Sequence, residues 1–328
     1  MESNYSGLPS EDEIVSAWGG EATPLVSICC IAFNHERYVE DALVGFLMQK
    51  TTFPFEILIH DDASLDGTAD IIRSYQVRYP RIIKPIFQEV NQYSRGISMN
   101  ATFNISRAKG NYIAFCEGDD YWSDRDKLAL QVDKLEKSGA EICCHPTRVK
   151  FFHEDLEVSE KDGYGDWGER ESLLSFKDIL MKGGGAFSLS SIVVSKKVFD
   201  DLRERSETFY FNRISHFFIQ LLGSWGGGAV YLPRYMSVYR SNHAGSWSYS
   251  NSGRVDFAVN NIDKYFNSLT VFFRLYGVYG AYRWRIYYLF FRRVLGFMLN
   301  GHFPLMARCR SLPRLLSLFF SAPRTSYN

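Results

Sequence analysis

The stretch FEILIHDDASLDGT, residues 55–68, decides the fold of this chain. Residues 55–59 are mostly apolar, as in a strand that is covered on both faces of a sheet. A run of acidic residues follows at once, and from Thr68 onward the apolar residues recur at helical spacing. A strand, an acidic turn and a helix in this order are typical of one βαβ unit.

The same alternation continues on both sides of this stretch. The pattern predicts strands at 25–33, 55–59, 82–87, 112–116 and 141–145, and helices at 38–47, 68–77, 98–108 and 126–135. Strands and helices that alternate in this way predict an α/β domain with a mostly parallel sheet flanked by helices. Ligands bind such sheets at the carboxyl ends of the strands, so the polar residues after each strand are the candidate site.

The sequence pattern changes twice in the remainder of the chain. Residues 153–171 are acidic and glycine-containing, which predicts an exposed loop. We then expect helices near 172–181 and 212–222, strands near 190–194, 229–232 and 236–239, and helices from 252 to the end. These patterns predict a flexible tail at 1–23, a main domain at 24–250 with halves at 24–145 and 172–250, and a helical C-terminal region at 251–328.

Composition excludes some classes of protein. The 328 residues are 46% hydrophobic, which argues against wholesale disorder, and 37 basic residues balance 37 acidic ones, so the net charge predicts no nucleic-acid partner. The six cysteines form no C-x-x-C pair, which favours buried, reduced thiols. The N-terminus lacks the features of a signal peptide, and no apolar run approaches membrane-spanning length. We therefore expect a cytoplasmic protein.

Two acidic clusters directly follow predicted strands. Asp61 and Asp62 begin the first cluster, and Glu117, Asp119 and Asp120 form the second. Neighbouring carboxylates repel one another unless a cation or hydrogen-bond donors offset their charge. Such oxygen ligands suit Mg²⁺ or Mn²⁺, which proteins usually bind through one or two carboxylates together with substrate phosphates. The alternative is that the acids only form solvated turns.

An ordered series of residues resembles the opening of family 2 glycosyltransferases, which are nucleotide-sugar enzymes of the GT-A fold. The resemblance covers about 24–139 and is carried by Val26 to Asn34, the stretch 55–68, Asn91, Gly96, Asn100, Ala108, Gly110, Glu117 to Asp120, and Asp126 to Leu128. It implies an inverting transferase that uses a nucleotide-sugar donor, with UDP the expected nucleotide. Mn²⁺ or Mg²⁺ is the implied cofactor.

The resemblance also implies which residues bind the donor. Asp62 would accept a hydrogen bond from the base, Asp119 would face the ribose and the sugar, and Asp120 would hold the metal. The other residues implied for the nucleotide-sugar site are Ala32, Phe33, Asn34, Glu36, Ser64 and Asn100. Ile31 and Ala32 stand where the family usually has proline and threonine.

The general base departs from the family pattern. Where the family commonly has an aspartate at the start of a helix, this chain has Ser215 and His216. An imidazole can accept a proton near neutral pH, so His216 is the candidate base, and a purely structural histidine is the alternative. The carboxylates of Asp200, Asp201 and Glu207 are the other candidates nearby in sequence.

Two further segments resemble the acceptor side of the family. Ser190 and Ser191 precede a predicted strand and would bind acceptor hydroxyls, or else simply form a turn. Arg240 and His243 resemble the family's closing segment, and would approach the diphosphate. The implied partners are a nucleotide-sugar donor and a saccharide or lipid-linked saccharide acceptor in surface polysaccharide synthesis.

After Lys264 the only charged residues are nine arginines among many aromatic residues. Three interpretations stay open: a packed helical subdomain, a peripheral contact with the inner face of the cell membrane, and nucleic-acid binding, which no motif supports. Two other functions also stay open. One is a sugar nucleotidyltransferase, although Asn34 to Arg37 is no glycine-rich phosphate loop, and the other is a catalytically degenerate nucleotide-binding or scaffold module.

Overall fold

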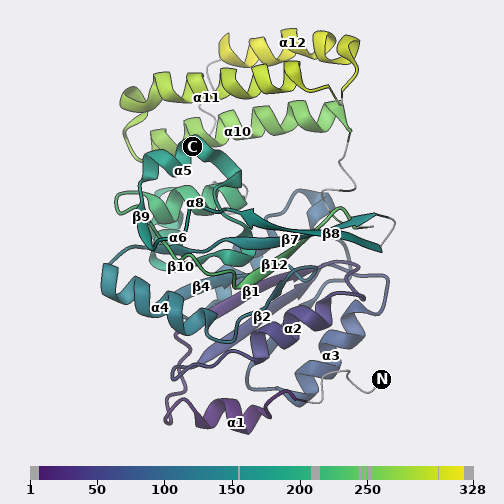
Figure 1. Ribbon diagram of the computed structural model, residues 1–328, viewed down its shortest axis with the longest axis vertical. Helices are drawn as coiled ribbons and strands as arrows, with labels where there is room; N and C mark the ends of the chain where they lie inside the picture. The colour runs from purple at the N-terminus through teal and green to yellow at the C-terminus, as the bar shows by residue number, and fades with distance from the viewer. Residues whose placement is uncertain are drawn as a thin grey trace. The chain divides into compact units, whose positions relative to one another are not determined.

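The computed structural model describes residues 7–153, 156–207, 215–243, 246, 249, 253–301 and 303–320 (Figure 1). The chain divides into two compact units, Met1–Ser246 and Trp247–Asn328. Their boundary lies close to the one that the sequence predicts between the main domain and the helical C-terminal region.

The first unit is built on an eight-stranded sheet of order β3-β2-β1-β4-β10-β6-β11-β9. Strands β1 (Val26–Ala32), β2 (Phe55–Asp61), β3 (Ile83–Phe87) and β4 (Tyr112–Phe115) are parallel neighbours. The other four are β6 (Ile142–Cys144), β9 (Ser172–Leu174), β10 (Val193–Ser195) and β11 (Ala229–Tyr231), of which β10 runs antiparallel to β4 and β6. The predicted α/β sheet is confirmed.

Helices flank this sheet because each presents one apolar face to it. They are α2 (Val39–Leu47), α3 (Thr68–Arg78), α4 (Lys127–Ser138), α5 (Phe176–Lys182), α6 (Lys197–Arg205) and α8 (His216–Ser224). The helix predicted at 98–108 is instead a π-turn, Asn100–Asn104, followed by a 3₁₀ turn, Ile105–Arg107. Within this segment the side chain of Asn104 donates a hydrogen bond to the carbonyl of Cys30, in β1, at 3.0 Å.

A second sheet of order β5-β12-β7-β8 completes the first unit. It contains β5 (Tyr121–Trp122), β7 (Thr147–His153), β8 (Leu156–Tyr164) and β12 (Ser237–Ser241). The predicted exposed loop at 153–171 is therefore wrong for β8, which pairs with β7 as an antiparallel hairpin. Nearly every side chain of β8 is exposed, so the alternation of apolar and polar residues that would indicate a strand is absent from its sequence.

The N-terminal segment is also ordered, so the predicted flexible tail is wrong from about residue 8 to residue 18. Ser10 caps a short helix, α1 (Glu11–Ser16), and Ile14 and Trp18 are buried in the hydrophobic core. The indole nitrogen of Trp18 donates to the hydroxyl of Thr51 at 3.2 Å. The prediction of a flexible tail followed from the acidic composition of the segment and did not take these two apolar residues into account.

The second unit is helical, as predicted, and contains α10 (Val255–Leu275), α11 (Tyr279–Leu299) and α12 (Leu305–Phe320). Aromatic contacts join its first two helices. The rings of Phe266 and Phe290 lie 4.7 Å apart, and the guanidinium of Arg293 lies 3.6 Å from the ring centre of Tyr265. Within the described residues, no helix is both long enough and apolar enough to cross a membrane.

Candidate active site

The two acidic turns lie on either side of the carboxyl end of β1. The amide of Asp62, after β2, donates to the carbonyl of Ala32 at 2.9 Å. The amide of Gly118, after β4, donates to the carbonyl of Ile31 at 2.8 Å. The structure therefore brings both predicted clusters to one edge of the sheet, as the parallel topology requires.

Backbone strain is concentrated at the same strand ends. Among the described residues, the non-glycine residues with positive φ are Asn34 (56°), Ala63 (64°) and Asn242 (67°). They follow the ends of β1, β2 and β12 within one or two residues. Asparagine adopts a left-handed backbone readily, whereas Ala63 does so at a cost in free energy, and such strain persists chiefly where function requires a fixed geometry.

Asp119 lies between two histidines. Its Oδ2 lies 3.1 Å from Nε2 of His243 and 3.8 Å from Nε2 of His35. Burial alone would raise the pKa of Asp119, but the two imidazoles outweigh this effect and the pKa is lowered. A side chain at residue 118 would crowd this arrangement, because an added Cβ would lie 2.9 Å from Nδ1 of His35. Gly118 therefore permits the contact.

The pKa of Asp120 is shifted in the opposite direction to that of Asp119, although the two residues are adjacent. Its side chain is buried, and its Oδ1 accepts a hydrogen bond from the amide of Arg240 at 2.9 Å. Burial, followed by the nearby charges of Asp119 and Glu117, holds the pKa of Asp120 well above its usual value. Adjacent acids whose pKa values are driven apart are typical of active sites.

Arg240 closes the site from the β12 side. Its guanidinium donates to the backbone carbonyl of Asp119 at 2.9 Å and forms an ion pair with Asp41 of α2. It also lies over two rings, 4.5 Å from the centre of Tyr121 and 5.1 Å from that of Tyr38. Sequence reasoning found Arg240 but missed Asp41 and Tyr38, whose contacts join segments about two hundred residues apart.

The acids of this edge fit a divalent cation of the Mg²⁺ type. No described residue donates a hydrogen bond to Oδ2 of Asp120, which leaves that oxygen for a ligand. In the described part of the chain, no group of three or more His, Cys, Asp or Glu side chains is arranged to hold a metal. Proteins usually bind Mg²⁺ through one or two carboxylates together with substrate phosphates.

The turn after β1 is connected to the turn after β2. Ser64 accepts a hydrogen bond from the amide of Asn34 at 2.9 Å, and the side chain of Asn34 accepts one from the amide of Leu65 at 2.8 Å. Glu36 similarly accepts from the amide of Gly67 at 3.1 Å. Phe33 is 38% exposed beside this turn, whereas Ala32 is buried. Of the residues predicted for the nucleotide, Asn34, Glu36 and Ser64 are thus joined through the two turns, with Phe33 exposed beside them, whereas Ala32 lies beneath the surface.

Asp62 is less exposed to solvent than a residue that contacts a nucleotide base would be. It is fully buried, and its two oxygens accept hydrogen bonds from the amides of Gln92 at 2.7 Å and Tyr93 at 3.0 Å. In this structure the carboxylate therefore holds the segment after β3. Asn100 lies in the neighbouring π-turn, where it accepts a hydrogen bond from Asn104 at 3.2 Å. Their roles toward a nucleotide stay predictions.

The two serines predicted to bind acceptor hydroxyls are buried completely. The hydroxyl of Ser190 contacts that of Ser237 at 3.3 Å, and the hydroxyl of Ser191 donates to the carbonyl of Ser188 at 2.8 Å. Trp122 also donates to the carbonyl of Ser190 at 3.0 Å. Neither serine side chain reaches the surface in this structure: Ser190 joins β5 to β12, whereas the hydroxyl of Ser191 bonds within its own turn. Their role toward an acceptor stays a prediction.

His216 begins α8, where Ser215 caps the helix as the sequence suggests. Its Nε2 lies 2.8 Å from the side-chain amide of Gln220, and burial lowers the pKa of His216 to about 4. The imidazole is therefore neutral at neutral pH. The other candidate carboxylates lie on or beside α6, where Asp200 pairs with Lys196 and Glu207 with Arg203 at the surface, and Asp201 is exposed.

Tyr164 is a site residue that the sequence did not reveal. Its ring lies 5.9 Å from that of Tyr239. Its hydroxyl donates to the backbone carbonyl of Gly184 at 3.4 Å. Burial, followed by the charges of Asp120 and Glu117, raises the pKa of this phenol. Because the sequence of β8 was interpreted as an exposed loop, no pattern pointed to this side chain.

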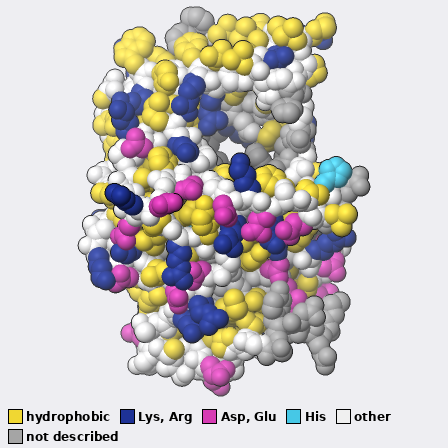
Figure 2. Space-filling model, viewed as in Figure 1, with side chains coloured by type: hydrophobic (Ala, Val, Ile, Leu, Met, Phe, Trp, Pro, Cys, Tyr) yellow, Lys and Arg dark blue, Asp and Glu magenta, His cyan; other side chains and the backbone are white. Residues whose placement is uncertain are grey.

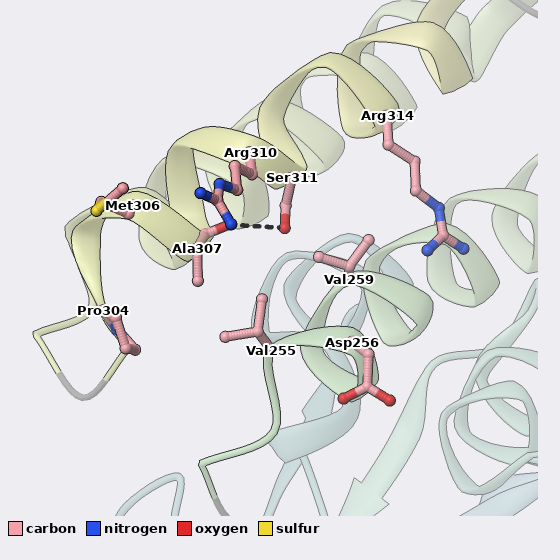
Figure 3. Close-up of a pocket in the computed structure, with 9 residues that line it drawn as sticks. All are labelled: Val255, Asp256, Val259, Pro304, Met306, Ala307, Arg310, Ser311 and Arg314. Atoms are coloured by element: carbon pink, nitrogen blue, oxygen red, sulfur yellow. Dashed lines mark hydrogen bonds between the residues drawn. The ribbon is translucent and has the colours of Figure 1, made fainter.

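A separate pocket lies within the second unit, between α10 and α12 (Figure 3). Its volume is about 640 Å³. None of the residues predicted for the sugar-nucleotide site contributes to it. Its lining residues are Val255, Asp256, Val259, Pro304, Met306, Ala307, Arg310, Ser311 and Arg314.

Comparison with known proteins defines the class to which this fold and site belong. The glycosyl transferase family 2 profile matches residues 27–203, which is more than half of the chain, and the chain belongs to that family. The protein Rv1520 of Mycobacterium tuberculosis is 33% identical over 235 residues, which are 71% of this chain and 63% of that protein. The match thus spans less than two thirds of that relative's length. Chondroitin synthase of Escherichia coli is 29% identical over 154 residues, 46% of this chain and 21% of the synthase.

Solved structures confirm the GT-A fold. A fragment of S. aureus TarS superposes with a TM-score of 0.52 at 14% identity, covering 92% of this chain and 74% of the fragment. GalNAc-T7 gives a TM-score of 0.51 at 12% identity, covering 74% of this chain and 48% of that one. The expected family and fold are therefore confirmed.

Proposed function

We propose that this chain is an inverting, metal-dependent glycosyltransferase that moves a sugar from a nucleotide donor, preferably a UDP-sugar, to a hydroxyl of a saccharide or lipid-linked saccharide. Surface polysaccharide synthesis is the proposed setting. The observation that carries the proposal is the pair of adjacent acids, Asp119 and Asp120, at the carboxyl edge of the sheet, where Asp119 contacts His243 at 3.1 Å and the buried Asp120 accepts a hydrogen bond from the amide of Arg240 at 2.9 Å. The family match supports it. So do the TarS fragment, solved with UDP-GlcNAc, and GalNAc-T7, solved with UDP and Mn²⁺.

The proposed roles follow the geometry of the acidic edge. Asp120 would hold Mn²⁺ or Mg²⁺, which would offset the negative charge that develops on the departing nucleoside diphosphate. Asp119 would face the ribose and sugar. Arg240 and His243, which already contact Asp119, would lie beside the diphosphate and supply positive charge or hydrogen bonds to it.

The donor's nucleoside would occupy the surface formed by Phe33, Asn34, Glu36 and Ser64. Contact between the base and Asp62 would require the backbone at 92–93 to release the carboxylate, since both of its oxygens are occupied by that backbone. We therefore expect donor binding to move this segment. The acceptor would approach past Tyr164, whose aromatic ring offers a face for a sugar.

His216 is the proposed general base. Its neutral imidazole could accept the proton of the acceptor hydroxyl, although a pKa of about 4 makes it a weak base. Gln220, whose amide lies within hydrogen-bonding distance, would orient the ring.

The proposal is tested first by ligand binding. Thermal shifts measured with nucleoside diphosphates, with and without Mn²⁺, should show stabilisation that is largest for UDP with the metal, because a ligand that binds only the folded state stabilises it. Asp120→Asn should abolish the metal-dependent part of the stabilisation by UDP, and it should also abolish glycosyl transfer. Asp133→Asn, which removes an exposed carboxylate of α4, should change neither. Full transfer by the Asp120 variant would refute the metal assignment.

One observation favours a second candidate function. The low pKa of His216 leaves the chain without a strong base at the expected position, as in a catalytically degenerate module that only binds nucleotide. Binding of UDP with Mn²⁺, measured by calorimetry, without turnover on any acceptor would support that function. A sugar nucleotidyltransferase would instead release pyrophosphate from UTP and a sugar phosphate.

A further inference from the structure

The outer face of α11 exposes a row of large apolar side chains. Successive members are separated by three or four residues, which places them on one side of a helix. The exposed fractions are 70% for Trp284, 55% for Tyr288, 42% for Phe291, 58% for Leu295 and 74% for Leu299. We call these five residues the α11 outer face.

This face is distinct from the one with which α11 packs inside its own unit. Ile286, Leu289 and Phe290 are almost completely buried, as are Val294 and Phe297 further along. The helix therefore has one apolar side that forms the core of the three-helix unit and a second one in contact with solvent. A second apolar side of this length, about 24 Å from Trp284 to Leu299, is costly to leave in water.

Charge accompanies the α11 outer face, and all of it is positive. Arg283, Arg285 and Arg292 belong to the same helix, whereas Arg293 packs over the ring of Tyr265 in α10, and the sequence contains no acidic residue after Asp263. Residues 247–328 hold eleven basic residues and two acidic ones. In the view of Figure 2, hydrophobic and basic side chains cover much of the surface over the C-terminal helices.

The pocket between α10 and α12 has a related composition. Val255, Val259 and Met306 provide apolar walls, while Arg310 and Arg314 lie one helical turn apart on α12 (Figure 3). Ser311 adds a hydroxyl, which donates to the carbonyl of Ala307 at 2.9 Å. The carboxylate of Asp256 also lines the pocket and pairs with Arg254 at 2.9 Å, and Arg314 donates to the side chain of Asn260 at 2.8 Å. Apolar walls beside two guanidinium groups suit a phosphate that is attached to hydrocarbon.

We infer that the second unit docks on the surface of an anionic phospholipid bilayer, with the α11 outer face in the interface and a lipid phosphate held by Arg310 and Arg314. Aromatic and leucine side chains gain free energy on entering the interfacial region, and arginines gain from anionic headgroups. A second copy of the chain fits less well, because pairing two such faces would bring arginines against arginines. The inference does not depend on the proposed glycosyl transfer.

Flotation of the full chain with lipid vesicles tests the inference without donor or acceptor. We expect binding to vesicles of phosphatidylcholine mixed with phosphatidylglycerol, and binding at least tenfold weaker to phosphatidylcholine alone. Added salt should weaken binding, since it screens the attraction between arginine and headgroups. Absence of binding to the anionic vesicles would overturn the inference.

Paired substitutions locate the binding surface. Tyr288→Ser with Leu295→Ser should weaken binding at least tenfold. A matched pair, Leu156→Ser with Val158→Ser, removes equally exposed apolar side chains from β8 and should leave binding unchanged. Circular dichroism should show that both variants keep their helix content, because the substituted side chains are exposed. Equal binding by the two double variants would refute the role of the α11 outer face.

Two further results separate the remaining interpretations. Arg310→Gln with Arg314→Gln should reduce the preference for phosphatidylglycerol, and an unchanged preference would refute the phosphate site. Sedimentation velocity should show that the chain alone forms no dimer through the α11 outer face. Such a dimer would be recognised because the Tyr288 and Leu295 substitutions dissociate it. Such a dimer, combined with no vesicle binding, would show that the face joins two copies of the chain.

Discussion

Arg240 contacts more parts of the candidate site than any other side chain that we describe there. It reaches Asp41 at the start of α2, the backbone of Asp119 after β4, and the rings of Tyr38 and Tyr121. Its own amide binds Asp120. Only a planar group with several donors can make these contacts together, so a lysine at this position would lose part of them.

Replacing Arg240 by lysine tests this interpretation. We expect Arg240→Lys to lower the free energy of unfolding by about 1 to 3 kcal/mol, because the buried partners of the guanidinium lose hydrogen bonds. We also expect kcat/KM for the donor to fall at least tenfold. Arg234→Lys is the control, since Arg234 forms exposed pairs with Asp124 and Asp126. Equal effects of the two substitutions would contradict the assignment.

His216 makes a prediction about pH. Its pKa is about 4 in the folded chain, below the ordinary value of about 6.5, so the unfolded chain takes up the proton first as the pH falls. The stability contributed by the neutral ring is complete above about pH 6.5 and is lost as the pH falls toward 4. Between pH 7 and 4.5, wild type should lose about 1 to 2 kcal/mol more than His216→Gln in urea unfolding. Parallel losses would show that the pKa of His216 is not lowered in the folded chain in solution.

At the scale of elements, α2 and β5 approach so closely that a glycine is needed between them. A Cβ added to Gly45 of α2 would lie 2.7 Å from the backbone oxygen of Trp122. Trp122 belongs to β5, which directly follows the acidic turn. The packing of α2 therefore helps to fix the position of Asp119 and Asp120.

Gly45→Ala should consequently destabilise the chain. Overpacking against a backbone atom costs about 1 to 3 kcal/mol, which exceeds the gain of up to about 1 kcal/mol from better helix propensity. Gly296→Ala in α11 is the matched control, because an added Cβ there meets nothing within 4 Å, and it should be neutral or stabilising. Thermal unfolding measures both. A stabilised Gly45 variant would mean that α2 and β5 can separate readily.

The elements also show what a sequence can and cannot reveal. Strands such as β2 were predicted because their side chains are apolar and buried, and the acids after them were found because parallel strands end at one edge. In contrast, β8 is exposed along its length, so its hydrophobicity carries no periodic pattern. The pairing of Asp41 with Arg240 was also unpredictable, since it depends on how α2 and β12 are placed by the finished fold.

At the scale of the whole molecule, a net charge of zero conceals two oppositely charged units. Residues 247–328 carry eleven basic and two acidic residues, out of 37 of each sign in the chain. The remaining residues are therefore acidic in balance. Molecules with this distribution attract one another at low ionic strength, basic unit to acidic unit.

This distribution predicts how solubility responds to salt. Near pH 7, where the net charge is zero, light scattering should show attraction between molecules at low salt that weakens as the ionic strength rises to about 0.15 M. Replacing Arg283 and Arg285 by glutamine should reduce the attraction in the absence of salt. Attraction that strengthens with salt would instead indicate that apolar contacts dominate.

The left-handed backbone of Ala63 limits how this protein can be made heat-resistant. Glycine at residue 63 would relieve about 1 kcal/mol of strain, so a selection for higher thermal stability would favour the substitution. Alanine, however, restricts the backbone of the turn between Asp62 and Ser64, whereas glycine would allow both of these residues to adopt more conformations. We expect variants selected for heat resistance alone to accept this exchange and to lose turnover, so a useful selection must demand both properties at once.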